Sequence, residues 1–217
     1  MLNLTKYLFA AAGLFALASG PAFAASVCPI ATGGSSGGEG ISSTYTTDSG
    51  VTNGGCNVLI TFNANGSITT TNPNGATSYD TGGDDNEVGI INNTGSAISS
   101  VNLSSAVDQI FGFDGDGICG GYTFSATPSA CSSPDASGYG PSSVTFTNVA
   151  SNDMSGTVDF SSGIAASGGS AFFSLEDPVD LNLTVTKGGA VPEPNSLVLL
   201  GTGILGVAGA FRRKLMS

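Results

Sequence analysis

The stretch Val179-Asp180-Leu181-Asn182-Leu183-Thr184-Val185-Thr186 alternates apolar and polar residues along its whole length. Successive side chains of a β-strand point to opposite faces, so this period of two predicts a strand with one buried face. Further short β-branched or apolar runs precede it, separated by turn residues: 57–63, 67–71, 87–93, 97–103, 143–149, 156–160 and 171–175. Without a helical pattern between the two chain ends, these runs predict an all-β domain, an antiparallel β-sandwich of the immunoglobulin-like or jelly-roll-like type.

Two pairs of these runs are predicted to form β-hairpins. Asn65-Gly66, a strong signal for a tight turn, separates the first two runs. Thr94-Gly95-Ser96 separates the third and fourth runs in the same way. In the fourth run Ile98, Val101 and Leu103 do not alternate perfectly, which favours a β-bulge there.

The first 24 residues have the three-part layout of a secretory signal peptide. Lys6 precedes an apolar run, and the small residues Ala22 and Ala24 predict cleavage by a signal peptidase before Ala25. The apolar run is shorter than the roughly 20 residues that a membrane-spanning helix needs. We therefore expect a cleaved signal helix at 1–24 and an exported mature chain.

The other end of the sequence, residues 188–217, has the parts of a sorting tail. It contains Val191-Pro192-Glu193-Pro194, then an uncharged apolar segment at 196–211, then Arg212-Arg213-Lys214. The two prolines favour an extended backbone around Glu193, which suits a protease cleft. We expect 196–211 to be a transmembrane helix, and the basic residues at 212–214 to hold its end in the cytoplasm.

This tail resembles the PEP-CTERM sorting signal of Gram-negative bacteria in the order of its three parts. The resemblance implies recognition by an exosortase, a membrane cysteine transpeptidase that removes the tail. It also implies a link to exopolysaccharide and biofilm formation. The expected localisation is a precursor tethered to the inner membrane and a mature form at the cell surface or outside the cell.

The centre of the chain, over residues 80–180, resembles a group of PEP-CTERM proteins of unknown activity. The shared segments, in order, are Gly83-Asp84-Asp85, Val88-Gly-Ile-Ile-Asn-Asn93, Ile110-Phe-Gly-Phe-Asp-Gly-Asp-Gly-Ile118, Ser137-Gly-Tyr-Gly140 and Phe173-Ser-Leu-Glu176. This resemblance supports the grouping and implies no activity.

The charge of the chain is unevenly distributed. All 16 acidic residues lie between Glu39 and Glu193, whereas no Lys or Arg occurs between Tyr7 and Thr186. Lys187 is the one basic residue of the predicted mature domain. Nucleic acids and anionic membrane surfaces are poor partners for such a field, and cations are good ones.

Four cysteines fall in the exported region, which indicates two disulfides. Three pairings are open, and we favour Cys28–Cys56 with Cys119–Cys131 because each closes a short local loop. The first would fasten a loose Gly/Ser-rich arm, residues 25–56, to the acidic β-sandwich domain at 57–187. A zinc site is disfavoured because the chain has no His and no closely spaced cysteine pair.

The missing side chains argue against an enzyme. Without His, neither a Ser-His-Asp nor a Cys-His device can be built. Disulfide-bonded cysteines cannot act as nucleophiles. Paired carboxylates such as Asp114 and Asp116 leave a carboxylate-dependent hydrolase as a minor alternative, with another acid expected across a cleft.

Two acidic segments are candidate calcium sites, because calcium prefers clustered carboxylate and carbonyl oxygens. Asp114 and Asp116 lie in a Gly-rich loop, and Asp80, Asp84 and Asp85 form a second group. Neither segment has the EF-hand pattern. The alternative for both is an ordinary Asp turn in which the carboxylate caps its own backbone. For Asp114 and Asp116 the calcium site and the turn are equally favoured. For the Asp80 group the turn is the favoured interpretation.

The sequence predicts a structural or adhesive component of the cell surface or extracellular matrix. The alternative is a carbohydrate-binding module for exopolysaccharide, which needs exposed aromatic side chains on one face. The candidates for that face are Tyr122, Phe124, Tyr139 and Phe146.

Overall fold

The computed structural model describes residues 27–34, 39–42, 45, 55–75, 78–124, 130–177 and 183–188. The predicted signal peptide (1–24) and sorting tail from residue 189 onward lie outside the described residues, as do 178–182. All regular structure in the described ranges is β, as the sequence predicts. The strands are β1 (Ala31–Gly34), β2 (Val58–Phe62), β3 (Ile68–Thr71), β4 (Asn86–Asn92), β5 (Ile98–Ser104), β6 (Tyr122–Phe124), β7 (Val144–Thr147), β8 (Ser155–Ile164), β9 (Gly169–Leu175) and β10 (Thr184–Lys187).

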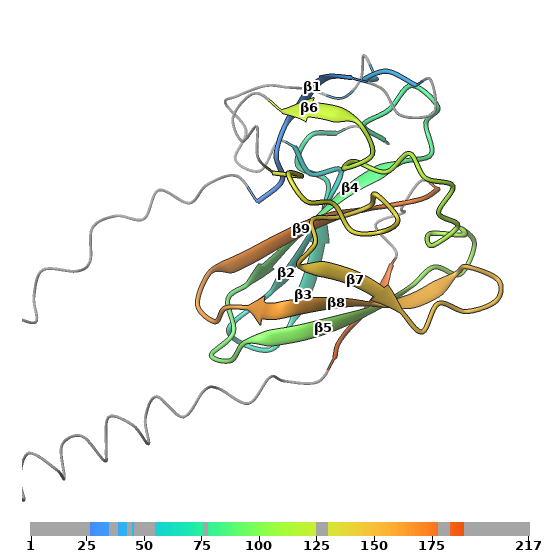
Figure 1. Cartoon of the computed structure of the whole chain (residues 1–217). Helices are drawn as coiled ribbons and strands as arrows, with labels where there is room; N and C mark the ends of the chain where they lie inside the picture. Colours follow the sequence, from blue (N-terminus) through green and yellow to red (C-terminus); the bar gives the residue numbers. More distant parts are fainter. Residues whose placement is uncertain are drawn as a thin grey trace, which may run out of the picture.

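The strands form two four-stranded sheets and one two-stranded sheet (Figure 1). One large sheet has the order β10-β5-β8-β7, the other β3-β2-β4-β9, and β1 pairs with β6 apart from both. The two large sheets share one hydrophobic core. Its fully buried side chains include Ile60 and Ile90 from one sheet, and Val101 and Val158 from the other. The period-two pattern is clear in β8, whose alternate residues Gly156, Val158 and Phe160 are buried.

The first predicted hairpin is confirmed. β2 and β3 pair antiparallel, with Phe62 opposite Ile68. Gly66 takes the left-handed conformation that the turn requires, at φ 86°. The side-chain oxygen of Asn65 accepts a hydrogen bond from the backbone N–H of Ser67 at 3.0 Å. Both residues therefore stabilise the turn, Asn65 through its hydrogen bond and Gly66 through its backbone conformation.

The second predicted hairpin is wrong. β4 pairs with β2 and β9, whereas β5 pairs with β8 and β10 in the other sheet. The connection between them crosses from one sheet to the other and is held by Asn92, which is fully buried. Its Nδ2 donates to the carbonyls of Ser96 at 2.9 Å and Ile164 at 3.0 Å, while its Oδ1 accepts from the N–H of Thr94 at 3.0 Å.

The expected sandwich is also not purely antiparallel, because β2 and β4 run parallel with Ile60 opposite Ile90. β4 is buried on both faces, as is usual for a central strand with parallel pairing. The predicted irregularity in β5 is confirmed, because the register with β8 shifts between Ile98 and Ser100. The immunoglobulin-like or jelly-roll-like type stays a prediction.

Both favoured disulfides, Cys28–Cys56 and Cys119–Cys131, are present. The described residues of the arm at 25–56 are not loose, because β1 pairs with β6 and the ring of Tyr45 is buried at 4% exposure. In the ranges that the structure describes, no helix is long and apolar enough to cross a membrane. The predicted helix at 196–211 lies outside those ranges.

Candidate functional site

Three carboxylates from distant parts of the chain meet at one end of the β3-β2-β4-β9 sheet. Asp85 directly precedes β4 and Glu176 directly follows β9, and these strands pair antiparallel with Asn86 opposite Leu175. This register makes Asp85 and Glu176 neighbours. Asp116 joins them from the loop between β5 and β6, and one carboxylate oxygen from each residue lies within 4.8 Å of the others. We call Asp85, Asp116 and Glu176 the acidic triad.

The hydroxyl of Tyr139 lies against the acidic triad. It hydrogen-bonds Oε1 of Glu176, and it lies 3.0 Å from Oδ1 of Asp116 and 3.2 Å from Oδ1 of Asp114. A phenol has one proton to donate. Tyr139 therefore satisfies one of these three carboxylates at a time, and the others need another source of hydrogen bonds or positive charge.

Close packing fixes the loop that carries Asp114 and Asp116. A Cβ on Gly117 would lie 2.5 Å from Cγ of the Tyr139 ring, so only glycine fits there. The backbone N–H of Ile118 donates to Oγ of Ser174 at 2.9 Å, and the N–H of Ser174 donates to the carbonyl of Tyr139 at 2.6 Å. Hydrogen bonds thus connect the acidic loop and Tyr139 to β9.

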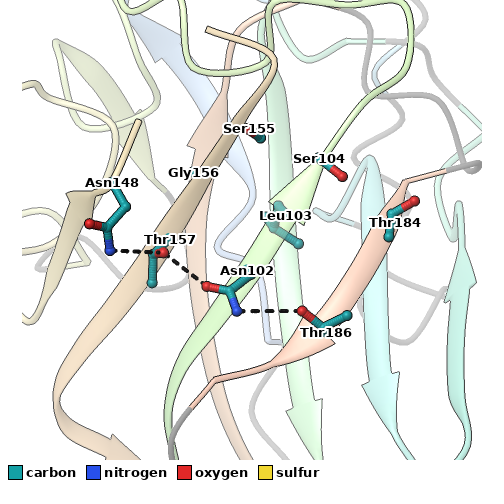
Figure 2. Close-up of a pocket in the computed structure, with 9 residues that line it drawn as sticks. All are labelled: Asn102, Leu103, Ser104, Asn148, Ser155, Gly156, Thr157, Thr184 and Thr186. Atoms are coloured by element: carbon teal, nitrogen blue, oxygen red, sulfur yellow. Dashed lines mark hydrogen bonds between the residues drawn. The ribbon is translucent and has the colours of Figure 1, made fainter. Parts of the chain in front are cut away.

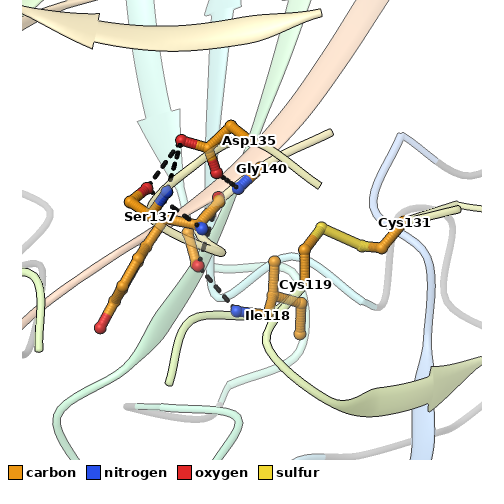
Figure 3. The surroundings of a disulfide bond; sticks show 8 residues. Ile118, Cys119, Cys131, Asp135, Ser137 and Gly140 are labelled. Carbon is orange, nitrogen blue, oxygen red and sulfur yellow. Dashed lines mark hydrogen bonds between the residues drawn. A yellow bond between two sulfur atoms is a disulfide. The ribbon is translucent and has the colours of Figure 1, made fainter. Parts of the chain in front are cut away.

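The turn that leads into Tyr139 is held by Asp135 beside the Cys119–Cys131 disulfide (Figure 3). Oδ2 of Asp135 accepts hydrogen bonds from the N–H and Oγ of Ser137 at 3.3 and 2.7 Å, and Oδ1 accepts from the N–H of Gly140 at 3.1 Å. The N–H of Cys119 donates to the carbonyl of Gly138 at 2.8 Å. The disulfide therefore lies next to the contact between the acidic loop and the Tyr139 turn.

Burial and mutual repulsion make the acidic triad reluctant to ionise. Burial, and then the charge of Glu176, raise the pKa of Asp85 to about 9. Burial is also the main reason that the pKa of Glu176 is raised to about 8 and that of Asp116 to about 7. The pKa of neighbouring Asp114 is lowered, chiefly by its hydrogen bond with Asp116. No Lys or Arg occurs between residues 7 and 186, so this stretch of the chain supplies no side-chain cation that could neutralise the acidic triad.

Asp85 is the most enclosed member of the triad. Its side chain is 2% exposed, and its Oδ1 is buried without a hydrogen bond. The hydroxyl of the fully buried Tyr79 interacts with the carboxylate of Asp85, and burial followed by the charge of Asp85 raises the pKa of this tyrosine. This contact lies outside ordinary hydrogen-bond geometry, so Oδ1 of Asp85 is incompletely satisfied, which is costly for a buried carboxylate.

A second acidic group combines Glu39, Asp80 and Asp84. Both oxygens of Asp80 accept backbone hydrogen bonds, Oδ2 from Gly83 at 2.9 Å and Oδ1 from Asp85 at 3.2 Å. The side chain of Asp80 therefore caps its own turn. Glu39 also accepts from a backbone N–H, that of Gly82, at 3.1 Å. The backbone contacts of Asp80 fit the turn interpretation.

The structure thus regroups the acids that the sequence singled out. Asp85 separates from Asp80 and Asp84 and joins Asp116 instead. Sequence reasoning missed Glu176 and Glu39, because each lies far along the chain from the groups it completes. The one available signal for Glu176 was an acid placed directly after a predicted strand.

The predicted aromatic face for sugar binding is wrong for three of its four residues. Tyr122, Phe124 and Tyr139 are buried, at 7%, 8% and 0% exposure. Phe146 is half-buried and lines a surface pocket of about 390 Å³ together with Phe113 and Thr145. Polar groups of Asp135, Ser137 and Ser142 complete this pocket.

A second surface pocket, of about 280 Å³, lies over β5, β8 and β10 (Figure 2). Its floor is a row of polar side chains. Asn148 donates to Thr157 at 3.4 Å, Thr157 donates to Asn102 at 2.9 Å, and Asn102 donates to Thr186 at 3.4 Å. The acidic triad lines neither of these two pockets.

One family model matches the chain, and it covers residues 190–214. The chain carries a PEP-CTERM protein-sorting motif. This confirms the resemblance seen in the tail. The PEP-CTERM motif implies processing by an exosortase, and with the two disulfides it indicates an exported protein of the cell surface. No curated protein and no solved structure matches the chain.

Proposed function

We propose that this protein is a structural or adhesive component of the cell surface or extracellular matrix, delivered through its PEP-CTERM tail. The sorting motif at residues 190–214 carries the proposal, because it makes the chain a substrate for export and surface sorting. The role is linked to exopolysaccharide or biofilm, as expected for this sorting system.

The fold suits such a role. Two sheets around one core, with two disulfides, make a module that resists unfolding outside the cell. The last described strand, β10, pairs with β5 up to Lys187, opposite Val101. The sorting motif at 190–214 therefore begins directly after a strand anchored in the sheet, so the tail connects to the folded module through a very short segment.

The sorting step is tested in the bacterium that produces the protein. Wild-type chain and a Glu193→Ala variant are followed by cell fractionation and by the mass of the mature product, with Asp153→Ala as a matched acidic control. We expect the variant to keep its tail and accumulate in the inner membrane, and the control to be processed. Normal processing of Glu193→Ala would overturn the proposal.

We also propose that the protein is not an enzyme. The absence of His from the chain and the burial of Asp85 and Glu176 support this, because a hydrolase needs its carboxylates open to substrate. Release of sugars from the producer's own exopolysaccharide, lost in Glu176→Gln, would contradict it and favour the carboxylate-dependent hydrolase.

Carbohydrate binding is the second candidate function, and the pocket of Phe113 and Phe146 favours it. Aromatic carbons beside polar Asp135, Ser137 and Thr145 are the mixed lining that sugar rings prefer. The test is retention of the full-length protein on immobilised exopolysaccharide. We expect Thr145→Tyr, which fills the pocket, to lose retention and Thr69→Tyr, on exposed β3, to keep it. Equal retention would remove this candidate.

A further inference from the structure

We propose that the acidic triad, Asp85, Asp116 and Glu176, assisted by Asp114, is a binding site for one divalent cation, and that the cation is calcium. The site goes beyond the sorting role proposed above and does not depend on it. Its ligands come from three segments: the residue before β4, the residue after β9, and the loop between β5 and β6.

The spacing of the oxygens fits calcium. Calcium binds oxygen at about 2.3–2.6 Å, so two ligands on opposite sides of one ion are at most about 5 Å apart. One oxygen from each member of the triad lies within 4.8 Å of the other two. Asp114 lies beside the triad, because its Oδ1 and that of Asp116 both contact the hydroxyl of Tyr139.

The unsatisfied oxygen of Asp85 is the second, independent observation. Its side chain is 98% buried, since its exposure is 2%, and no donor, including the nearby hydroxyl of Tyr79, reaches Oδ1 in hydrogen-bond geometry. Compare Asp80 in the neighbouring acidic group, where backbone N–H groups satisfy both oxygens. A carboxylate oxygen that is buried beside two other acids, without a well-placed donor, is suited to bind a cation.

The charged side chains around the acidic triad also favour a bound cation. Asp85, Asp114, Asp116 and Glu176 converge, and the one hydroxyl proton of Tyr139 is shared among three of them. Lys187 is the only basic residue within the described ranges, and its Nζ donates to Ser96 at 3.0 Å. A divalent ion would supply the positive charge that the side chains do not.

Calcium would also tie the fold together. Its ligands would join the edge strand β9, the central strand β4 and the loop that precedes the Cys119–Cys131 disulfide. Binding to the folded state alone raises the melting temperature by mass action. For a chain of this size, free calcium at 100-fold over Kd raises it by about 5–10 °C.

The experiment is a thermal melt of the full-length protein, disulfides formed and in mild detergent, in CaCl2 and then in excess EGTA. Asp116→Asn and Glu176→Gln are the test variants, and Asp108→Asn, which lies outside both acidic groups, is the matched control. We expect wild type and control to gain several degrees in calcium, and both test variants to lose most of that gain.

Two further outcomes are decisive. In EGTA the test variants should melt close to the wild-type temperature, because each amide keeps the shape of the neutral acid that it replaces. That result shows that they fold, so their lost calcium response reports the site. A wild-type protein that melts at the same temperature in calcium and EGTA would overturn the proposal, as would test variants that keep the full calcium response.

Discussion

The hydroxyl oxygen of Tyr139 lies 3.0 Å from Oδ1 of Asp116, although 22 residues separate them in the chain. The Tyr139 ring is fully buried and packs on Phe113 with centroids 4.4 Å apart. Tyr139→Phe should therefore fold normally and lose only the shared proton donor. We expect a loss of about 1–3 kcal/mol in the free energy of unfolding without calcium, measured by urea unfolding in EGTA. Unchanged stability would mean that the hydroxyl does not satisfy the carboxylates.

Gly117 is predicted to tolerate no side chain. In Gly117→Ala the new Cβ would lie 2.5 Å from the Tyr139 ring, so the acidic loop or the ring must move. We expect destabilisation of about 1–3 kcal/mol by chemical unfolding, together with weaker calcium binding. The control is Gly95→Ala, where a Cβ meets nothing within 4 Å. Equal stability of the two variants would contradict the close packing.

The two disulfides should differ little in their effect on stability. Their loops span 28 residues for Cys28–Cys56 and 12 for Cys119–Cys131, so loop entropy predicts that each contributes about 3 kcal/mol. Paired Cys→Ser variants, unfolded in urea, measure both. Removal of Cys119–Cys131 should in addition weaken the calcium response, because this bridge lies next to the Tyr139 turn. A calcium response lost only with Cys28–Cys56 would contradict that arrangement.

Glu87 should make the protein less stable as pH rises. It is fully buried, accepts one hydrogen bond from Tyr45 at 3.0 Å, and has a pKa raised well above 4.5, chiefly by burial. The folded state then keeps a proton that the unfolded chain loses above about pH 4.5. Stability that is complete below that pH declines as pH rises toward the folded pKa, by up to about 1.4 kcal/mol per pH unit for this one proton.

Glu87→Gln keeps the shape of the neutral acid and removes that proton. We expect the free energy of unfolding, measured in EGTA between pH 5 and 8, to fall less steeply in Glu87→Gln than in wild type. Asp108→Asn serves as the control and should follow wild type. A wild-type slope in Glu87→Gln would show that Glu87 ionises without penalty in the folded protein.

The sequence predicted most strands and the first hairpin, because period-two patterns and the Asn65-Gly66 turn act locally. The same reasoning failed at Thr94-Gly95-Ser96. Turn residues there specify that the chain changes direction, but not that it enters the opposite sheet. That choice depends on Asn92, whose carbonyl partner Ile164 lies 72 residues further along the chain.

The candidate site was predictable in part for the same reason. Asp114 and Asp116 stand out in one loop, and Asp85 belongs to a visible acidic run. However, the pairing of β4 with β9 decides that Asp85 meets Glu176 and leaves Asp80 behind. Strand pairing over some 90 residues is a long-range property, and the local pattern of acids does not contain it.

The most direct measurement of the central claim is a crystal structure of the full-length protein grown with calcium. The proposed site predicts one ion with anomalous signal between Asp85, Asp116 and Glu176, at about 2.3–2.6 Å from an oxygen of each. Density that instead shows these carboxylates bonded to one another and to Tyr139, with no ion at saturating calcium, would contradict the account.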